Sequence, residues 1–189
     1  MRTEKTELLG EILKRTRLQK GYYASEVTLD YGSDKTKRVD FLQFVPAHTF
    51  SVSGIEQGEF ICYEVKSCLE DIYSGNGLNF YGDKNYIVMN METYKSFMDD
   101  FADRVVSRGL NAQNRKFWPW YKENHPYGMT NIGILVAVPK DRKIYDEFEN
   151  PTEFDDDTDW RLESIQSSLP QPRLKSVTEL LFCMLRSGK

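Results

Sequence analysis

The most constraining feature of this 189-residue sequence is a nearly apolar segment that is interrupted by charge close to its end. This segment, residues 59–67, is rich in aromatic and β-branched residues and contains few polar ones. This pattern predicts a strand in a well-covered sheet. Strand alternation places Glu64 and Lys66 on the same face, two residues apart. Charged groups in such a strand are costly unless they have a partner or a task, so these two residues are candidates for function.

The sequence before this strand predicts a helix and a hairpin. Apolar residues recur with helical spacing over residues 3–20, where Thr3 is placed to cap the helix and Gly21 to end it. Residues 26–31 alternate between apolar and polar, and residues 38–45 form a second predicted strand after turn-forming residues. We therefore expect a helix followed by an antiparallel strand pair.

The sequence after this strand continues with mixed elements. Residues 68–81 are rich in turn-forming residues and predict a loop with room for one short helical turn. A short strand over 86–90, a helix over 92–108 and a strand over 131–138 follow. Consecutive early strands and later alternation with helices predict an α/β fold with a central mixed sheet flanked by helices.

The C-terminal quarter differs in composition from the rest. Residues 139–173 carry five basic and ten acidic residues, a net charge of −5 in a chain whose total is −4. We expect this segment to be an exposed, partly mobile excursion. A helix is predicted over 174–186, which gives an expected organisation of a core (1–138), the acidic excursion (139–173) and a C-terminal helix packed on the same domain (174–189).

Composition also excludes several classes of protein. The longest apolar run, residues 180–185, is far too short to span a bilayer, and no secretory signal is visible. Three cysteines give no disulfide framework, and the two histidines lie far from them in sequence, which disfavours a zinc site. We expect a reduced, cytoplasmic protein with no membrane partner.

A second carboxylate points to metal chemistry. Asp40 interrupts the otherwise apolar strand over 38–45, and neighbouring strands would let Asp40 and Glu64 converge on one cation. Mg²⁺ and Mn²⁺ prefer oxygen ligands, to which the backbone carbonyl of Val65 could add. A bound metal lowers the pKa of water and stabilises charge on a phosphate, while Lys66 is placed to orient or activate the water. The alternative interpretation is a surface ion pair between Glu64 and Lys66.

The spacing of these residues resembles the PD-(D/E)XK nuclease superfamily. Asp40 is followed 24 positions later by Glu64-Val65-Lys66, behind an amphipathic helix. The resemblance implies a restriction-endonuclease-like α-β-β-β-α-β core, with the aspartate on the second strand and the second motif on the third. It also implies metal-dependent hydrolysis of DNA in a prokaryotic or phage setting, in repair, recombination or restriction.

Within the superfamily, the sequence is similar to small bacterial and phage proteins of the MmcB-like kind. The similarity rests on a glutamate in the first strand, an R-x-D strand, an E-[IV]-K-S strand and an aspartate-containing loop before a tyrosine-containing strand. These correspond to Glu26, Arg38-Val39-Asp40, Glu64 to Ser67 and Gly82 to Tyr86. The motif's proline is replaced by Val39, and residues 74–80 depart from the MmcB-like loop.

The identity of a further acidic residue stays open at this stage. The superfamily often uses a glutamate of the first helix, which would be Glu11 or Glu4. The MmcB-like pattern instead implies Glu26.

Basic residues supply candidate contacts to DNA phosphates. These are Lys14, Arg17, Lys37, Arg38 and Lys84. Ordinary solvated surface charges are an equally good interpretation of most of them. A homodimer is a further expectation, because many similar endonucleases cut both strands as dimers. The alternative to an enzyme is a non-catalytic nuclease-like module that binds DNA or a protein, and a structural phage or assembly protein is a third interpretation.

Overall fold

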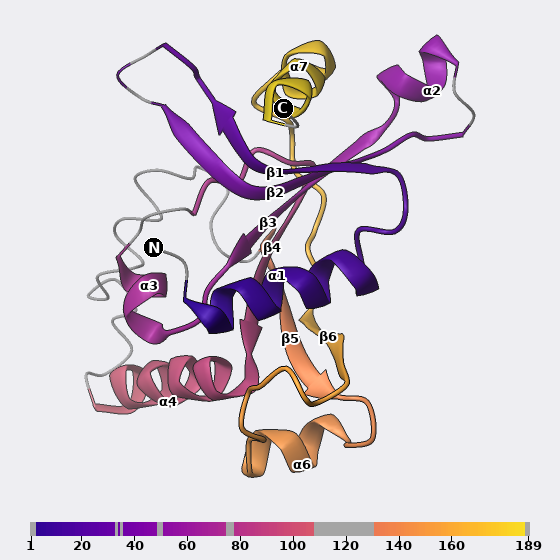
Figure 1. The fold of residues 1–189 in the computed structure, drawn as a ribbon. Helices are drawn as coiled ribbons and strands as arrows, with labels where there is room; N and C mark the ends of the chain where they lie inside the picture. The colour runs from indigo at the N-terminus through magenta and orange to yellow at the C-terminus, as the bar shows by residue number, and fades with distance from the viewer. Residues whose placement is uncertain are drawn as a thin grey trace.

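The described part of the chain forms one open sheet with helices on both faces (Figure 1). The structure is a computed structural model and describes residues 3–32, 34, 36–48, 51–74, 78–107 and 131–187. Six strands lie side by side in chain order, β1-β2-β3-β4-β5-β6. The prediction of an α/β fold with a mixed sheet is confirmed.

The strands are β1 (Tyr22–Leu29), β2 (Lys37–Val45), β3 (Glu59–Val65), β4 (Lys84–Asn90), β5 (Gly133–Pro139) and β6 (Trp160–Gln166). The described helices are α1 (Glu4–Thr16), α2 (Val52–Glu56), α3 (Leu69–Tyr73), α4 (Met91–Ser107), α6 (Ile144–Glu149) and α7 (Val177–Ser187).

The type of strand pairing changes twice across the sheet, from antiparallel to parallel and back. The first three strands form an antiparallel meander, whereas β3, β4 and β5 run parallel. The last strand, β6, returns antiparallel to β5 and makes the far edge. The parallel strands β3 and β4 are therefore central and covered on both faces, as their almost wholly buried residues require.

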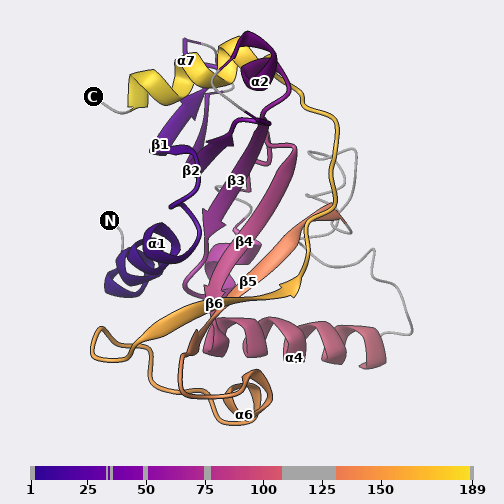
Figure 2. The same cartoon turned by 90° about the vertical axis from the view of Figure 1, so that its right-hand side faces the viewer.

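Helices cover opposite faces of this sheet (Figure 2). The helix α1 packs through Leu9, Ile12 and Leu13 onto one face, in a core cluster with Phe41 and Tyr63. The other face is covered by α3, α4 and α6 over the parallel strands and by α7 over β1 and β2. Successive strand residues therefore contribute to different cores, which is the ordinary consequence of strand alternation.

The first helix begins as predicted and ends earlier. The side chain of Thr3 caps α1 by accepting a hydrogen bond from the backbone N–H of Thr6 at 3.2 Å. The helix ends at Thr16, and the Gln43 side-chain amide donates to the backbone carbonyls of Arg17 and Lys20 in the turn that follows. Gly21 then has a positive φ of 78°, and a side chain there would lie 2.2 Å from a backbone oxygen of β2.

The expectation of an exposed excursion over 139–173 is wrong. This segment contains α6 and the strand β6, which pairs with β5 along its length. Trp160 is only 1% exposed and lies in the core beneath α1. Glu147 is fully buried and paired with Arg142 at 2.6 Å. The high proportion of acidic residues suggested an exposed segment, although the apolar residues of β6 alternate as in a strand.

The C-terminal helix packs against the first strand, as expected for a helix on the same domain. The helix α7 buries Leu180, Cys183 and Met184 against β1 and β2. The chain leading to it is held by an ion pair between Arg173 and Asp83 at 2.9 Å. Among the described helices, none is long and apolar enough to cross a membrane.

Candidate metal and catalytic site

The two predicted carboxylates lie on neighbouring central strands. The β2–β3 register pairs Phe41 with Tyr63, so Asp40 lies across from Glu64. The Oδ2 atom of Asp40 accepts a hydrogen bond from the backbone N–H of Val65 at 2.8 Å. The structure therefore brings Asp40 to the Glu64-Val65 part of the motif, on the face opposite α1.

Glu64 is fully buried, and among the residues that the structure describes only one of its oxygens has a hydrogen-bond donor. Its Oε1 accepts a hydrogen bond from the backbone N–H of Asn79 at 3.2 Å. Its Oε2 is buried with no hydrogen-bond donor in the described part of the chain. Burial, and next the neighbouring Asp40 carboxyl, raise the pKa of Glu64 well above its ordinary value, although Lys66 and Asn79 act in the opposite direction.

Lys66 is buried beside these carboxylates and has an acidic neighbour that the sequence analysis missed. Its side chain is 4% exposed, and its Nζ lies 3.3 Å from Oδ1 of Asp71. Asp71 belongs to the first turn of α3, within the segment predicted as a loop with one helical turn. In the sequence, the one sign of this contact is that Asp71 is acidic and follows the motif's lysine by five positions. Asp71 offsets the cost of burying the Lys66 ammonium.

Residues 78–80 pack beside the two carboxylates. Leu78, Asn79 and Phe80 are all buried. The backbone of Asn79 donates to Glu64, and its side-chain Nδ2 donates to the backbone carbonyl of Arg38 at 2.8 Å. Asn79 thus joins β2 and β3 at the site. Its position inside a turn-rich segment gave no sign of this role in the sequence.

Glu26 lies near the site but has a different described partner. The β1–β2 pairs on either side of it leave Glu26 across from Asp40. The residue has a positive φ of 55°, which disturbs the strand. Its Oε2 forms an ion pair with Nε of Arg38 at 2.7 Å. Glu26 therefore lies next to the site, and its carboxylate is paired with the Arg38 guanidinium.

Glu11, the other candidate acidic residue, lies away from the site. It is exposed on α1 and paired with Lys14, with 2.6 Å between Oε1 and Nζ. The helix α1 packs on the face of the sheet that carries Tyr63. Glu64 has Ile87 as its cross-strand neighbour, and Ile87 belongs to the core on the opposite face. The sheet thus separates Glu11 from the two carboxylates.

The basic residues that were expected to contact DNA lie in different parts of the structure, and only some of them are near the carboxylates. Lys37 and Arg38 are exposed at the start of β2, next to Asp40. Arg17 and Lys84 instead line a pocket on the α1 face of the sheet. Lys14 lies on α1 over the ring of Phe41, at 5.9 Å from its centre. Only Lys37 and Arg38 are therefore placed beside the carboxylates.

The oxygen atoms at this site suit a hard divalent cation. Within the described ranges, no three His, Cys, Asp or Glu side chains are grouped to hold a metal. Asp40 and Glu64 supply two carboxylates, and Mg²⁺ is often held by one or two carboxylates together with water and substrate phosphate. The buried Glu64 Oε2, which has no donor in the described ranges, fits such an ion because a cation would neutralise it.

The chain defines an α/β protein with an acidic site at the centre of a mixed sheet. Comparison with models of protein families, with curated proteins and with solved structures finds no match in any of the three.

Proposed function

We propose that this protein is a metal-dependent nuclease that hydrolyses phosphodiester bonds in DNA. The observation that carries the proposal is the pair of carboxylates, Asp40 and Glu64, on adjacent strands beside a buried Lys66. If Lys66 served only in a structural ion pair, one carboxylate would be enough, and Asp71 already supplies it. A purely structural role therefore does not explain the two further carboxylates. Burying Glu64 with an oxygen that lacks a donor among the described residues costs stability, which is a common sign of a functional site.

The arrangement of elements supports a restriction-endonuclease-like core. The order helix, three strands, helix and strand is present as α1, β1, β2, β3, α4 and β5, with α2, α3 and β4 added. Asp40 lies in the second strand, and Glu64 and Val65 end the third. This agrees with the resemblance on which the site was predicted.

The residues of the site have distinct proposed roles. Asp40, Glu64 and the backbone carbonyl of Val65 would hold Mg²⁺ or Mn²⁺. The bound metal would lower the pKa of water and stabilise charge on the scissile phosphate. Lys66 carries a positive charge in a site of low polarity, where it stabilises negative charge developing on the phosphate more strongly than in water.

DNA would reach the site along the exposed start of β2. Lys37 presents positive charge there, next to Asp40, and Arg38 lies beside it with its guanidinium paired to Glu26. Cations at this position neutralise backbone phosphates irrespective of sequence. A cytoplasmic location and a homodimer that cuts both strands stay predictions.

Cleavage of DNA tests the proposal. Supercoiled plasmid and an end-labelled single strand are incubated with the protein and Mn²⁺ or Mg²⁺, with EDTA as a control. We expect metal-dependent cutting that falls by about 100-fold or more in Glu64→Gln. Glu92→Gln is the matched control, because Glu92 is 64% exposed and forms a surface ion pair with Lys5.

A non-catalytic binding module is the second candidate. The observation in its favour is that the described residues offer two carboxylates rather than a group of three metal ligands. A folded protein that binds DNA and cuts neither substrate in any of these metals would favour the module over the enzyme.

A further inference from the structure

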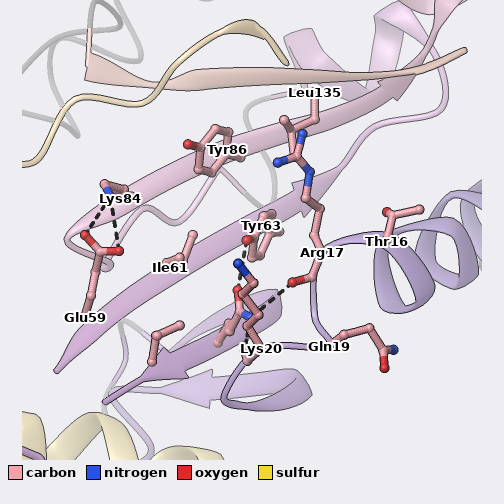
Figure 3. Close-up of a pocket in the computed structure, with 12 residues that line it drawn as sticks. Thr16, Arg17, Gln19, Lys20, Glu59, Ile61, Tyr63, Lys84, Tyr86 and Leu135 are labelled. Atoms are coloured by element: carbon pink, nitrogen blue, oxygen red, sulfur yellow. Dashed lines mark hydrogen bonds and ion pairs between the residues drawn. The ribbon is translucent and has the colours of Figure 1, made fainter. Parts of the chain in front are cut away.

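A second polar site lies on the opposite face of the sheet from Asp40 and Glu64. It is a pocket of about 420 Å³ between the end of α1 and strands β3 and β4 (Figure 3). Tyr63 forms part of it, whereas the adjacent Glu64 points to the other face. The volume is within the range of ordinary small-molecule sites. The pocket is therefore separate from the proposed nuclease site.

One wall of the pocket is held rigidly by Gln43. Its Nε2 donates to the backbone carbonyls of Arg17 and Lys20, where the chain leaves α1. Its Oε1 accepts a hydrogen bond from the hydroxyl of Tyr63 at 2.9 Å. Gln43 and Tyr63 are both nearly fully buried, so the wall exists before any ligand arrives.

The charges around the pocket favour an anion. Lys84 is neutralised by Glu59, with 2.9 Å between Nζ and Oε1. Arg17 rises on the other side of the pocket in Figure 3 and donates to the backbone carbonyl of Leu162 at 3.1 Å. Within the described residues, neither Arg17 nor Lys20 has a carboxylate partner. Two positive charges therefore remain for a ligand.

The floor of the pocket favours an aromatic group. Tyr63 and Tyr86 stack on each other, with ring centres 5.6 Å apart and an angle of 17° between the rings. Gly133 leaves the space for Tyr86, since a side chain there would lie 2.3 Å from its ring. In the described part of the chain, the hydroxyl of Tyr86 has no hydrogen-bond partner. Ile61 and Leu135 complete an apolar surface.

We propose that this pocket binds a nucleoside monophosphate. The phosphate would lie between Arg17 and Lys20, where two cations match its charge of about −2. The base would lie against Tyr86, Ile61 and Leu135, with the Tyr86 hydroxyl on a polar edge of the ring. The ligand is either a free nucleotide or the phosphorylated end of a strand, because both present the same chemical group.

Calorimetric titration with deoxyadenosine monophosphate tests this assignment. Deoxyadenosine and inorganic phosphate are titrated separately, and we expect each to bind at least about tenfold more weakly than the nucleotide. A 5′-phosphorylated oligonucleotide in a parallel titration separates the two sources. Tighter binding of the oligonucleotide identifies a strand end, and tighter binding of the monomer identifies a free nucleotide.

Four variants locate the binding. Lys20→Ala should weaken it about tenfold, and we expect this variant to fold because the Lys20 side chain is exposed. Tyr86→Phe keeps the ring and should weaken binding through loss of the hydroxyl. Lys14→Ala, on α1 but outside the pocket, and Glu64→Gln should both leave the affinity unchanged.

Three results would overturn the assignment. They are absence of nucleotide binding at millimolar concentration, binding that Lys20→Ala does not change, and binding that disappears in Glu64→Gln. Because Glu64→Gln should abolish cleavage and leave nucleotide binding intact, failure of this proposal is distinguishable from failure of the proposed nuclease function.

Discussion

Asp40 accepts a hydrogen bond from the backbone N–H of Val65, with 2.8 Å between Oδ2 and the nitrogen. Val65 lies between Glu64 and Lys66, so this single bond fixes Asp40 relative to both neighbouring side chains. An asparagine at position 40 could accept the same bond through its amide oxygen. Asp40→Asn therefore removes the charge while keeping the local structure, which makes it the most informative substitution at the site.

Divalent metal should stabilise the protein only when both carboxylates are present. A ligand that binds the folded state raises the melting temperature by mass action. At saturating Mn²⁺ we expect a rise of about 5 °C or more for the natural protein. Differential scanning fluorimetry should show no such rise for Asp40→Asn, whereas Glu92→Gln should behave like the natural protein. An equal rise in Asp40→Asn would place the metal elsewhere.

Removing the charge of Glu64 should stabilise the metal-free protein. The carboxylate is fully buried next to the Asp40 carboxyl, and its Oε2 has no donor among the described residues. In Glu64→Gln, one of the two carboxylate oxygens is replaced by an NH2 group, which can donate a hydrogen bond to Asp40. Urea unfolding in EDTA should show a gain of about 1–3 kcal/mol in the free energy of unfolding. A loss of stability would mean that the carboxylate of Glu64 is worth more to the fold, through partners such as the Asn79 backbone N–H, than its burial costs.

Asp71 should affect catalysis without affecting the metal. Its Oδ1 lies 3.3 Å from Nζ of the buried Lys66, so Asp71→Asn weakens the positioning of this ammonium. We expect the cleavage rate to fall about tenfold, as is usual for a residue that positions another. The metal-induced rise in melting temperature should persist. Glu70→Gln is the matched control on the same helix, because Glu70 is exposed. Loss of the metal effect in Asp71→Asn would make Asp71 a ligand instead.

The ion pairs of Lys175 should make stability depend on alkaline pH. A hydrogen bond to Asp30, and next one to Glu179 at 3.0 Å, raise the pKa of Lys175 above its ordinary value of 10.5. A raised lysine pKa stabilises the fold below the unfolded-state pKa, and this contribution is lost as the pH rises through the folded-state value. Lys175→Met should therefore cost about 1–2 kcal/mol at pH 8.

Urea unfolding of both proteins between pH 8 and pH 12 measures this difference. It should shrink above about pH 10.4, where lysine in the unfolded chain loses its proton. A difference that stays constant up to pH 12 would show that Lys175 contributes by packing rather than by charge.

The central part of the fold was predictable because its signals are local. Alternation and turn chemistry gave the hairpin, and the apolar run over 59–67 gave the central strand. Once these strands are neighbours, the proximity of Asp40 and Glu64 follows from register alone. The contacts of Asp71 and Asn79 depend on how the segment after β3 folds back over the sheet, and no periodic pattern reports that path.

The last third of the chain was predicted less well, for a different reason. The high net charge of residues 139–173 masks the alternation of apolar residues within them, in which Trp160 and Leu162 mark the buried face of a strand. Strands at the edge of a sheet often carry charged residues at their solvent-exposed positions. An acidic segment can therefore form an edge strand such as β6. Glu26 was also read as part of a regular strand, and its positive φ is not visible in the sequence.

The most direct test of the account compares Mn²⁺ binding with DNA cleavage in one buffer. Calorimetry gives the occupancy of the site at each Mn²⁺ concentration, and cleavage of a labelled duplex gives the rate. The account predicts that the rate follows occupancy and that both are lost together in Asp40→Asn and Glu64→Gln. A protein that binds Mn²⁺ through these carboxylates and leaves every DNA substrate intact would contradict it, as would cleavage that persists when both are replaced.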